Sequence, residues 1–209
     1  MSTKRRAAER RRLEKLRSHE RLLEAVGVTP IAGVDEVGMG PLAGPVVAAA
    51  VILPPTPLIE GMDDSKALTR LARARIEVEI RKIAIAIGIG IVGAPEVDEL
   101  NIYQAGLEAM RRAVLALSVP PRHVLVDGRS VPGLEPPQTA FPKGDGRVYS
   151  IAAASVVAKV HRDHLMAALE DRHPGYGFAS HVGYATAEHR EAIRRLGPCP
   201  EHRRSFTLL

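Results

Sequence analysis

A glycine- and proline-rich turn between two apolar segments constrains the fold of this chain more than any other feature. Residues 31–37 (IAGVDEV) and 46–53 (VVAAAVIL) are short and apolar, and the eight residues GMGPLAGP separate them. The prolines of this turn bar a helix, and short apolar segments bounded by such turns are typical of buried strands. The sequence therefore predicts a hairpin-like start whose first strand contains two acidic residues, Asp35 and Glu36.

The remainder of the chain mixes helical and strand patterns. Residues 2–25 are rich in Arg, Glu, Ala and Leu, which favours a helix or a helical, partly disordered arm. The residue pattern predicts further helices over residues 71–84, 101–118, 148–172 and 188–196, and strands over residues 84–92 and 123–126. Ser65 or Thr69 is the expected N-cap of the second helix. Strands and helices mixed in this way predict an α/β domain, in which helices cover the faces of an open sheet.

The basic character of the chain is concentrated at its N-terminus. Residues 1–30 hold nine of the 29 Lys and Arg and four of the 24 Asp and Glu, so the remaining 20 of each sign balance. This segment is either a site of nonspecific duplex attraction or a solvated helical tail. With three Phe, four Tyr and no Trp, the chain lacks the aromatic platforms of single-strand binders. A duplex gripped through its phosphates fits this composition better.

Other features of the sequence set the expected compartment. The lone Cys199 forms no intramolecular disulfide, and the most apolar windows are too short to span a bilayer. No charged stretch leads into an apolar signal segment at the N-terminus. We expect a cytoplasmic monomer that does not associate with membranes.

Four acidic residues stand beside glycine or at strand ends within apolar sequence: Asp35, Glu36, Asp127 and Asp145. Carboxylates in such surroundings are costly unless they are paired or bind a cation. Hard divalent ions such as Mg²⁺ and Mn²⁺ prefer oxygen ligands, and two such ions can clamp the attacking and leaving oxygens of a phosphodiester. Each acid taken alone is more often a cap, turn or salt-bridge residue than a catalytic one.

The positions of Asp35 and Glu36 raise a geometric problem. Neighbouring residues of a regular strand point to opposite faces of the sheet. Both acids can serve one site only if the strand bends or ends there. The glycines at positions 38 and 40 make such a departure plausible.

A series of distinctive segments runs from Ile31 to Phe206: IAGVDEVGMGPLAGPVVAAAVIL, DDSKALT, NIYQAGLEAM, VLVDG, KGD, SIAAASVVAKVHRDHLM, HPGYGF and HVGYATAEHREAIRRLGPCPEHRRSF. In this order they resemble the signature segments of bacterial ribonuclease HII. The resemblance implies a ribonuclease H-like fold with a central mixed sheet flanked by helices and a C-terminal helical segment. It divides the chain into a basic arm, residues 1–29, and a catalytic domain, residues 30–209.

The same resemblance implies the chemistry. Asp35, Glu36, Asp127 and Asp145 fall on the acidic positions that bind two divalent ions, Mg²⁺ or Mn²⁺. Family enzymes hydrolyse the RNA strand of RNA/DNA hybrids and incise 5′ of ribonucleotides embedded in duplex DNA, leaving 3′-hydroxyl and 5′-phosphate ends. A noncatalytic hybrid-binding protein of the same fold is the alternative, and the presence of all four acids argues against it. Nothing in the sequence supports contact with a replication clamp, although such a contact is open.

Recognition of the 2′-hydroxyl falls, by similarity, on two elements. The turn of Gly38, Met39 and Gly40 supplies main-chain contacts to that hydroxyl, and Tyr184 stacks against the sugar at the RNA to DNA junction. The middle residue of this turn is usually Arg in the family, so Met39 removes a cation suited to phosphate. Because Met39 replaces this Arg, we expect weaker binding and poorer incision at single embedded ribonucleotides, with cleavage of long hybrids less affected.

Further polar residues within the matching segments are candidates for contacts with backbone phosphates or for support of the acids: Ser65, Lys66, Lys143 and Lys159. Lys143 either lowers the pKa of nearby Asp145 or contacts a backbone phosphate. Arg203 and Arg204 either contact nucleic acid or complete the packing of the tail. His161 and His164 share a helix face, and we expect them to be surface or capping residues rather than metal ligands.

A dinucleotide-binding loop is the main competing interpretation, because GMGPLAG follows a predicted strand. The glycine spacing differs by one residue from that fingerprint, and the prolines with the following apolar strand exclude the required helix N-terminus. We therefore reject this interpretation.

Overall fold

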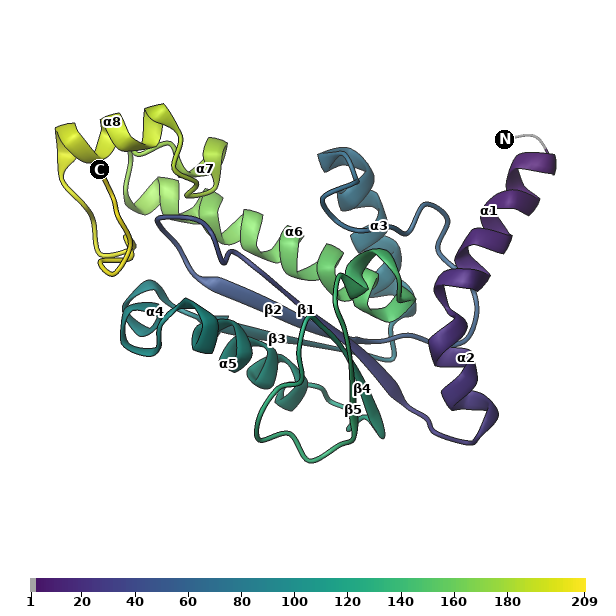
Figure 1. Ribbon diagram of the computed structural model, residues 1–209. Coiled ribbons are helices and arrows are strands. Elements are labelled where there is room, and N and C mark those ends of the chain that lie inside the picture. Colours follow the sequence, from purple (N-terminus) through teal and green to yellow (C-terminus); the bar gives the residue numbers. More distant parts are fainter. Residues whose placement is uncertain (1–2) are drawn as a thin grey trace.

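A single mixed sheet forms the centre of the molecule. The computed structural model describes residues 3–209 (Figure 1). Its five strands are ordered β3-β2-β1-β4-β5; β1 pairs antiparallel with β2 and β2 with β3, whereas the β1–β4 and β4–β5 pairs are parallel. The strands are β1 (Ile31–Val37), β2 (Val46–Ile52), β3 (Ala86–Val92), β4 (His123–Asp127) and β5 (Gln138–Phe141).

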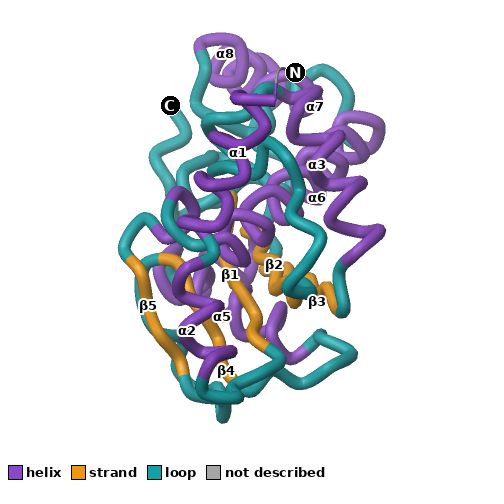
Figure 2. The backbone as a smooth tube through the Cα atoms, turned by 90° about the vertical axis from the view of Figure 1, so that its right-hand side faces the viewer, coloured by secondary structure: helices purple, strands orange, loops and turns teal. Residues whose placement is uncertain are grey.

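Helices cover the faces of the sheet, and further helices lie beyond its two ends (Figure 1). They are α1 (Thr3–Leu16), α2 (Ser18–Ala25), α3 (Arg70–Ile83), α4 (Ala94–Leu100), α5 (Ile102–Leu115), α6 (Tyr149–Arg172), α7 (Phe178–His181) and α8 (Ala187–Leu196), with a short 3-10 helix, η1, at Gly144–Gly146. Figure 1 shows α1 and α2 at the right of the molecule and α8 at the upper left, and Figure 2 views the backbone from the side of α1 and α2. Within residues 3–209, no helix combines the length and apolar character required to cross a bilayer.

Strand β2 shows how the sequence builds two cores on one sheet. All seven of its residues are buried. Ala49 and Val51 pack with α6 in one apolar cluster, while Ala48 and Ala50 pack with α5 in another. Alternate residues of a strand face opposite sides of a sheet, so a strand buried on both faces must be apolar throughout. The predicted α/β architecture, with helices on the faces of a mixed sheet, is confirmed.

The alanine-rich sequence of α6 allows this helix to approach β1 closely. A Cβ atom built on Gly33 would lie 2.1 Å from the backbone carbonyl carbon of Ser150. The small residues on the inner face of α6 are fully buried. Helix α6 therefore packs on the strand that carries the first two acids with almost no side chain between them.

The N-terminal arm is helical and docked on the domain. The structure divides it at Arg17 into α1 and α2; Ser2, where the predicted helix began, lies outside the described residues. Leu13 and Leu16 are buried in the α6 cluster. Glu20 accepts hydrogen bonds from the backbone N–H and the hydroxyl of Ser150, at 2.8 and 2.7 Å. The arm is thereby fixed at the N-terminus of α6.

Several local elements differ from the sequence-based expectations. Thr69, not Ser65, caps α3, because its side chain accepts the N–H of Ala72 at 3.2 Å. Helix α5 ends at Leu115, three residues before the predicted Ser118 and before the prolines at 120 and 121. Strand β5 and helices α4 and α7 were not predicted, because each has no more than seven residues and shows little periodicity.

We predict that Gly33→Ala lowers the free energy of unfolding by about 3 kcal/mol or more, since the added methyl group would overlap the α6 backbone. Urea unfolding followed by circular dichroism measures this loss. Gly146→Ala is the matched control, because a Cβ there meets no atom within 4 Å. Equal stability of the two variants would contradict the close packing.

Candidate active site

The candidate site lies where two parallel strands separate. Strand β1 stays paired with β2 as far as Val37, but its pairing with β4 ends at Val34, opposite Val126. Asp35 and Glu36 come directly after that point on β1, and Asp127 comes directly after it on β4. All three acids therefore border the same gap.

The gap resolves the problem of the adjacent acids. Asp35 is buried and hydrogen-bonds Ser155 on α6, whereas Cγ of Glu36 lies near Gly106 of α5, on the opposite face. One carboxylate oxygen from each of Asp35, Glu36 and Asp127 nevertheless lies within 4.8 Å of the others. The expected bend is replaced by a regular strand that has lost one neighbour, so both side chains can reach its open edge.

Asp145 reaches the site on the 3-10 helix η1. The residue before it, Gly144, donates its N–H to Oδ1 of Asp127 at 2.5 Å, which fixes η1 beside β4. Oδ2 of Asp145 accepts a hydrogen bond from Nζ of Lys66 at 3.1 Å, and Asp145 is not one of the three acids whose oxygens lie within 4.8 Å of one another. Its charge still raises the pKa values of the other three carboxyl groups, so the four acids form one electrostatic unit.

The proton affinity of the cluster is high. Burial raises the pKa of Asp35 well above its usual range, and the charges of Glu36 and Asp127 add to this effect. Burial and then the charge of Asp127 raise the pKa of Glu36 to about 7. The pKa of Asp127 is also raised by burial, against the stabilising N–H of Gly144. Without a cation, the site holds these carboxylates together against their mutual repulsion.

The donor set fits a hard divalent cation. Oxygens on opposite sides of one Mg²⁺ lie about 4 Å apart, close to the 4.8 Å limit within which the three carboxylates meet. Among the described residues, no other group of three or more Asp, Glu, His or Cys side chains has the spacing of metal ligands. His161 and His164 are not part of this group.

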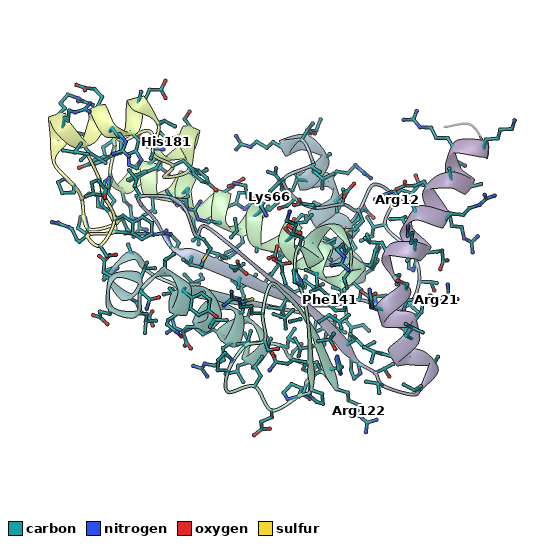
Figure 3. All side chains as sticks on the ribbon, in the orientation of Figure 1. Arg12, Arg21, Lys66, Arg122, Phe141 and His181 are labelled. Atoms are coloured by element: carbon teal, nitrogen blue, oxygen red, sulfur yellow. The ribbon has the colours of Figure 1, made fainter. Side chains whose placement is uncertain are left out.

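A buried polar network supports the acids from α6. The hydroxyls of Ser65 and Ser155 lie 2.8 Å apart, and Ser155 also hydrogen-bonds Asp35. Arg73 donates to the carbonyl of Ser65 at 3.0 Å and thereby holds the segment that carries Lys66. In Figure 3, Lys66 lies near the middle of the molecule, on the α6 side of the sheet. Sequence reasoning missed Ser155 and Arg73, because a serine in an alanine-rich helix and an arginine on α3 have no distinctive pattern.

The predicted recognition turn lies next to Tyr184. A Cβ on Gly40 would be 3.8 Å from the Tyr184 ring, whose residue is 46% exposed. Gly38 has a φ of +91°, which side chains rarely adopt, and a Cβ there would meet the buried Arg162 at 2.4 Å. The Met39 side chain packs toward Gly106 of α5, the same glycine that Glu36 approaches. Met39 of the turn and the acid Glu36 thus both lie against Gly106 of α5.

The remaining candidate lysines occupy different positions. Nζ of Lys159 pairs with Asp163 at 2.5 Å on α6. Lys143 is exposed, with a φ of +56°, and the ion pair to Asp145 comes from Lys66 instead. Arg204 is exposed, whereas Arg203 is fully buried and belongs to the packing of the tail.

Fold and site together define the class of this protein: an α/β domain of the ribonuclease H-like fold with a carboxylate cluster that fits a divalent cation. A solved ribonuclease H2 from Pyrococcus horikoshii has a TM-score of 0.72 and 25% identity, covering 85% of this chain and 94% of that one. A ribonuclease HII from Archaeoglobus fulgidus, solved in complex with PCNA, has a TM-score of 0.72 and 26% identity, over 87% and 96% of the two chains.

Sequence comparison then specifies the family. The family model for ribonuclease HII matches residues 32–209. Ribonuclease HII of Geobacillus kaustophilus is 58% identical over 97% of this chain and 77% of its own length. That of Moorella thermoacetica is 55% identical over 96% and 97%. The chain belongs to the ribonuclease HII family of endonucleases, which have ribonuclease H activity on RNA/DNA hybrids and depend on metal.

We predict that the raised pKa of Glu36 makes the metal-free protein less stable as pH rises. Between the ordinary value of 4.5 and about 7, the folded protein retains a proton that the unfolded chain has released. The unfolded state therefore binds fewer protons, and stability falls with rising pH across this window, by up to about 3 kcal/mol.

Urea unfolding in EDTA at pH 5 and pH 8 tests this prediction, with wild type compared to Glu36→Gln. The variant should lose this part of the pH dependence, while Glu188→Gln, an exposed acid on α8, should retain it. A pH dependence identical in wild type and Glu36→Gln would show that Glu36 titrates normally.

Proposed function

We propose that this protein hydrolyses the RNA strand of RNA/DNA hybrids and incises on the 5′ side of ribonucleotides embedded in duplex DNA, leaving 3′-hydroxyl and 5′-phosphate ends. The convergence of Asp35, Glu36 and Asp127 within 4.8 Å, beside a glycine turn, carries this proposal. The first element supplies ligands for the reaction centre, and the second supplies a surface that can approach a sugar closely.

In the proposed mechanism, Asp35, Glu36, Asp127 and Asp145 would hold two divalent ions, Mg²⁺ or Mn²⁺. When bound, such ions would supply activation of the attacking water and stabilisation of the leaving oxygen. The acids must be ionised to serve as ligands, so Ser155 and the N–H of Gly144, which hydrogen-bond Asp35 and Asp127, favour the required charge state. Lys66 balances the charge of Asp145 and presents its ammonium group, which is largely exposed, toward substrate phosphates.

Substrate selectivity is proposed to arise from the turn of Gly38, Met39 and Gly40 together with Tyr184. The exposed tyrosine ring next to Gly40 forms a flat surface for the sugar. Main-chain groups of the turn would then contact the 2′-hydroxyl, the group that distinguishes RNA from DNA. Lys143, exposed near η1, and Lys159, tied to Asp163, are secondary candidates for phosphate contacts.

The proposed organisation retains a basic arm over residues 1–29 and a catalytic domain over residues 30–209. We also include a sliding clamp as a partner to be tested, because a structural relative with 26% identity forms a complex with PCNA. We propose that the chain acts as a cytoplasmic monomer.

Nuclease assays test the function directly. Labelled DNA duplex with one ribonucleotide and an RNA/DNA hybrid should be cut in Mg²⁺ or Mn²⁺, while an all-DNA duplex should remain intact. Asp35→Asn should lower kcat/KM by at least about 100-fold, because the substitution removes the negative charge of a carboxylate at the centre of the proposed metal site. Asp171→Asn, an exposed acid at the end of α6, is the control and should retain activity.

Cleavage that persists in EDTA or survives Asp35→Asn would reject the metal mechanism. Binding of the hybrid without any cut would favour the noncatalytic alternative. The product ends, read by ligation and by phosphatase treatment, distinguish the proposed 3′-hydroxyl and 5′-phosphate from other chemistries.

We predict that Met39→Arg raises kcat/KM on the single-ribonucleotide duplex more than on the long hybrid, because it restores a forked cation at the turn. Met39→Leu, which keeps an apolar side chain against Gly106, is the matched control. Unchanged kcat/KM on both substrates in Met39→Arg would refute the importance of this position.

A further inference from the structure

Two buried arginines lie beneath the recognition turn without a carboxylate partner. Arg203 and Arg162 are both 0% exposed, and neither forms a salt bridge within residues 3–209. A buried guanidinium is costly unless its donors are hydrogen-bonded. Burial lowers the pKa of Arg203 to about 9, which leaves the cation charged at neutral pH. Such a cost calls for a local explanation.

The hydrogen bonds of Arg203 all go to main-chain carbonyls of one turn. The guanidinium donates to the oxygens of Gly38 at 2.6 Å, Met39 at 3.1 Å, Pro41 at 2.8 Å and Gly44 at 2.9 and 3.1 Å. Four carbonyls from a seven-residue segment thus converge on one side chain. This cradle determines the orientation of the peptide groups in the turn.

The second arginine and the tail hold this cradle in place. Arg162 on α6 donates to the carbonyls of Ala43 and Pro45 in the same turn. Asp98 on α4 accepts the N–H groups of Arg204 and Ser205, which anchors the segment directly after Arg203. The turn is therefore fixed from both α6 and the C-terminal tail.

The orientation of the carbonyls determines where the N–H groups point. In a trans peptide, the N–H points opposite to the carbonyl of the preceding residue. Because the carbonyls of Gly38 and Met39 point at the buried Arg203, the N–H groups of Met39 and Gly40 point away from it. Among the described residues, neither N–H has a hydrogen-bond acceptor. Two unpaired donors therefore lie at the turn, next to the exposed Tyr184.

We propose that Arg203 is a positioning residue for ribose recognition, which turns the N–H groups of Met39 and Gly40 toward the 2′-hydroxyl of the substrate. This inference rests on the proposed function of the turn. Arg203 touches no substrate; it acts by binding the opposite ends of the two peptide groups. A neutral residue or a single-headed cation cannot hold several carbonyls in the planar fan of a guanidinium.

Binding measurements test this role in the Asp35→Asn background, which allows equilibrium binding in Mg²⁺ without cleavage. Fluorescence anisotropy gives Kd for a DNA duplex with one ribonucleotide and for the same duplex with the matching deoxyribonucleotide. The Kd of the all-DNA duplex divided by the Kd of the duplex with one ribonucleotide isolates the contribution of the 2′-hydroxyl. We expect Arg203→Lys and Arg203→Gln to lower this ratio by about tenfold, the contribution of about one hydrogen bond, with little change for the all-DNA duplex.

Arg204→Gln is the matched control, because it removes the same charge from the exposed neighbouring side chain. It should weaken both duplexes equally and leave the ratio unchanged. Phe206→Leu provides a milder test if the Arg203 variants do not fold. It removes the aromatic ring 5.3 Å from the Arg203 guanidinium but keeps the hydrogen bonds, so we expect a two- to threefold lower ratio.

Three results would overturn the inference. An unchanged ratio in a folded Arg203→Lys or, where that variant is unfolded, in Phe206→Leu would show that the turn keeps its orientation without this arginine. Equal weakening of both duplexes would show a charge effect alone. A ratio of one in the unaltered Arg203 background would instead reject recognition of the 2′-hydroxyl by the turn, and with it the proposed function of Gly38 to Gly40.

Discussion

The separation of β1 from β4 after Val34 is the constraint on which the site depends. A sheet with continuous pairing would place the side chains of Asp35 and Glu36 on opposite faces, each covered by a different helix. With β4 absent from one edge, the two carboxylates reach the same gap and meet Asp127 there. The repulsion among these buried charges is opposed by fixed donors on α6 and η1. The fold therefore holds together a group of like charges that a cation can stabilise.

The same strand leads directly into the turn that we propose for ribose recognition. Two residues after Glu36, the chain enters a turn whose carbonyls are gathered by two buried arginines from distant parts of the sequence. The clustered carboxylates Asp35 and Glu36 precede this junction in the chain, and the N–H groups of Met39 and Gly40 follow it. The reacting phosphate and the adjacent sugar of one nucleotide require opposite chemistry from the protein. In the proposed function, a strand end followed by a glycine turn would supply both within six residues, from Asp35 to Gly40.

The sequence predicts the elements that depend on short-range chemistry. Apolar runs indicate β1 and β2, Asn101 indicates the start of α5, and acids within apolar sequence indicate the site. The contacts made by Arg203 could not be predicted, because they join residues about 160 positions apart and their acceptors are main-chain atoms. Ser65 was expected as a possible cap, but its hydroxyl faces Ser155, since the loop before α3 folds back onto α6. Short elements such as β5 depend on neighbouring strands rather than on their own residues.

Segments near both ends of the chain contact parts of the candidate site. Glu9 accepts the N–H of Gly61, and Arg12 donates to the carbonyl of Met62, just before the segment that carries Lys66. Figure 3 shows Arg12 on this helix, beyond Lys66 toward the N-terminal end. At the other terminus, the tail carries Arg203 beneath the turn. Affinity tags and truncations at either end would therefore disturb segments that are hydrogen-bonded to parts of the candidate site. Neither terminus is a neutral attachment point for immobilisation or labelling.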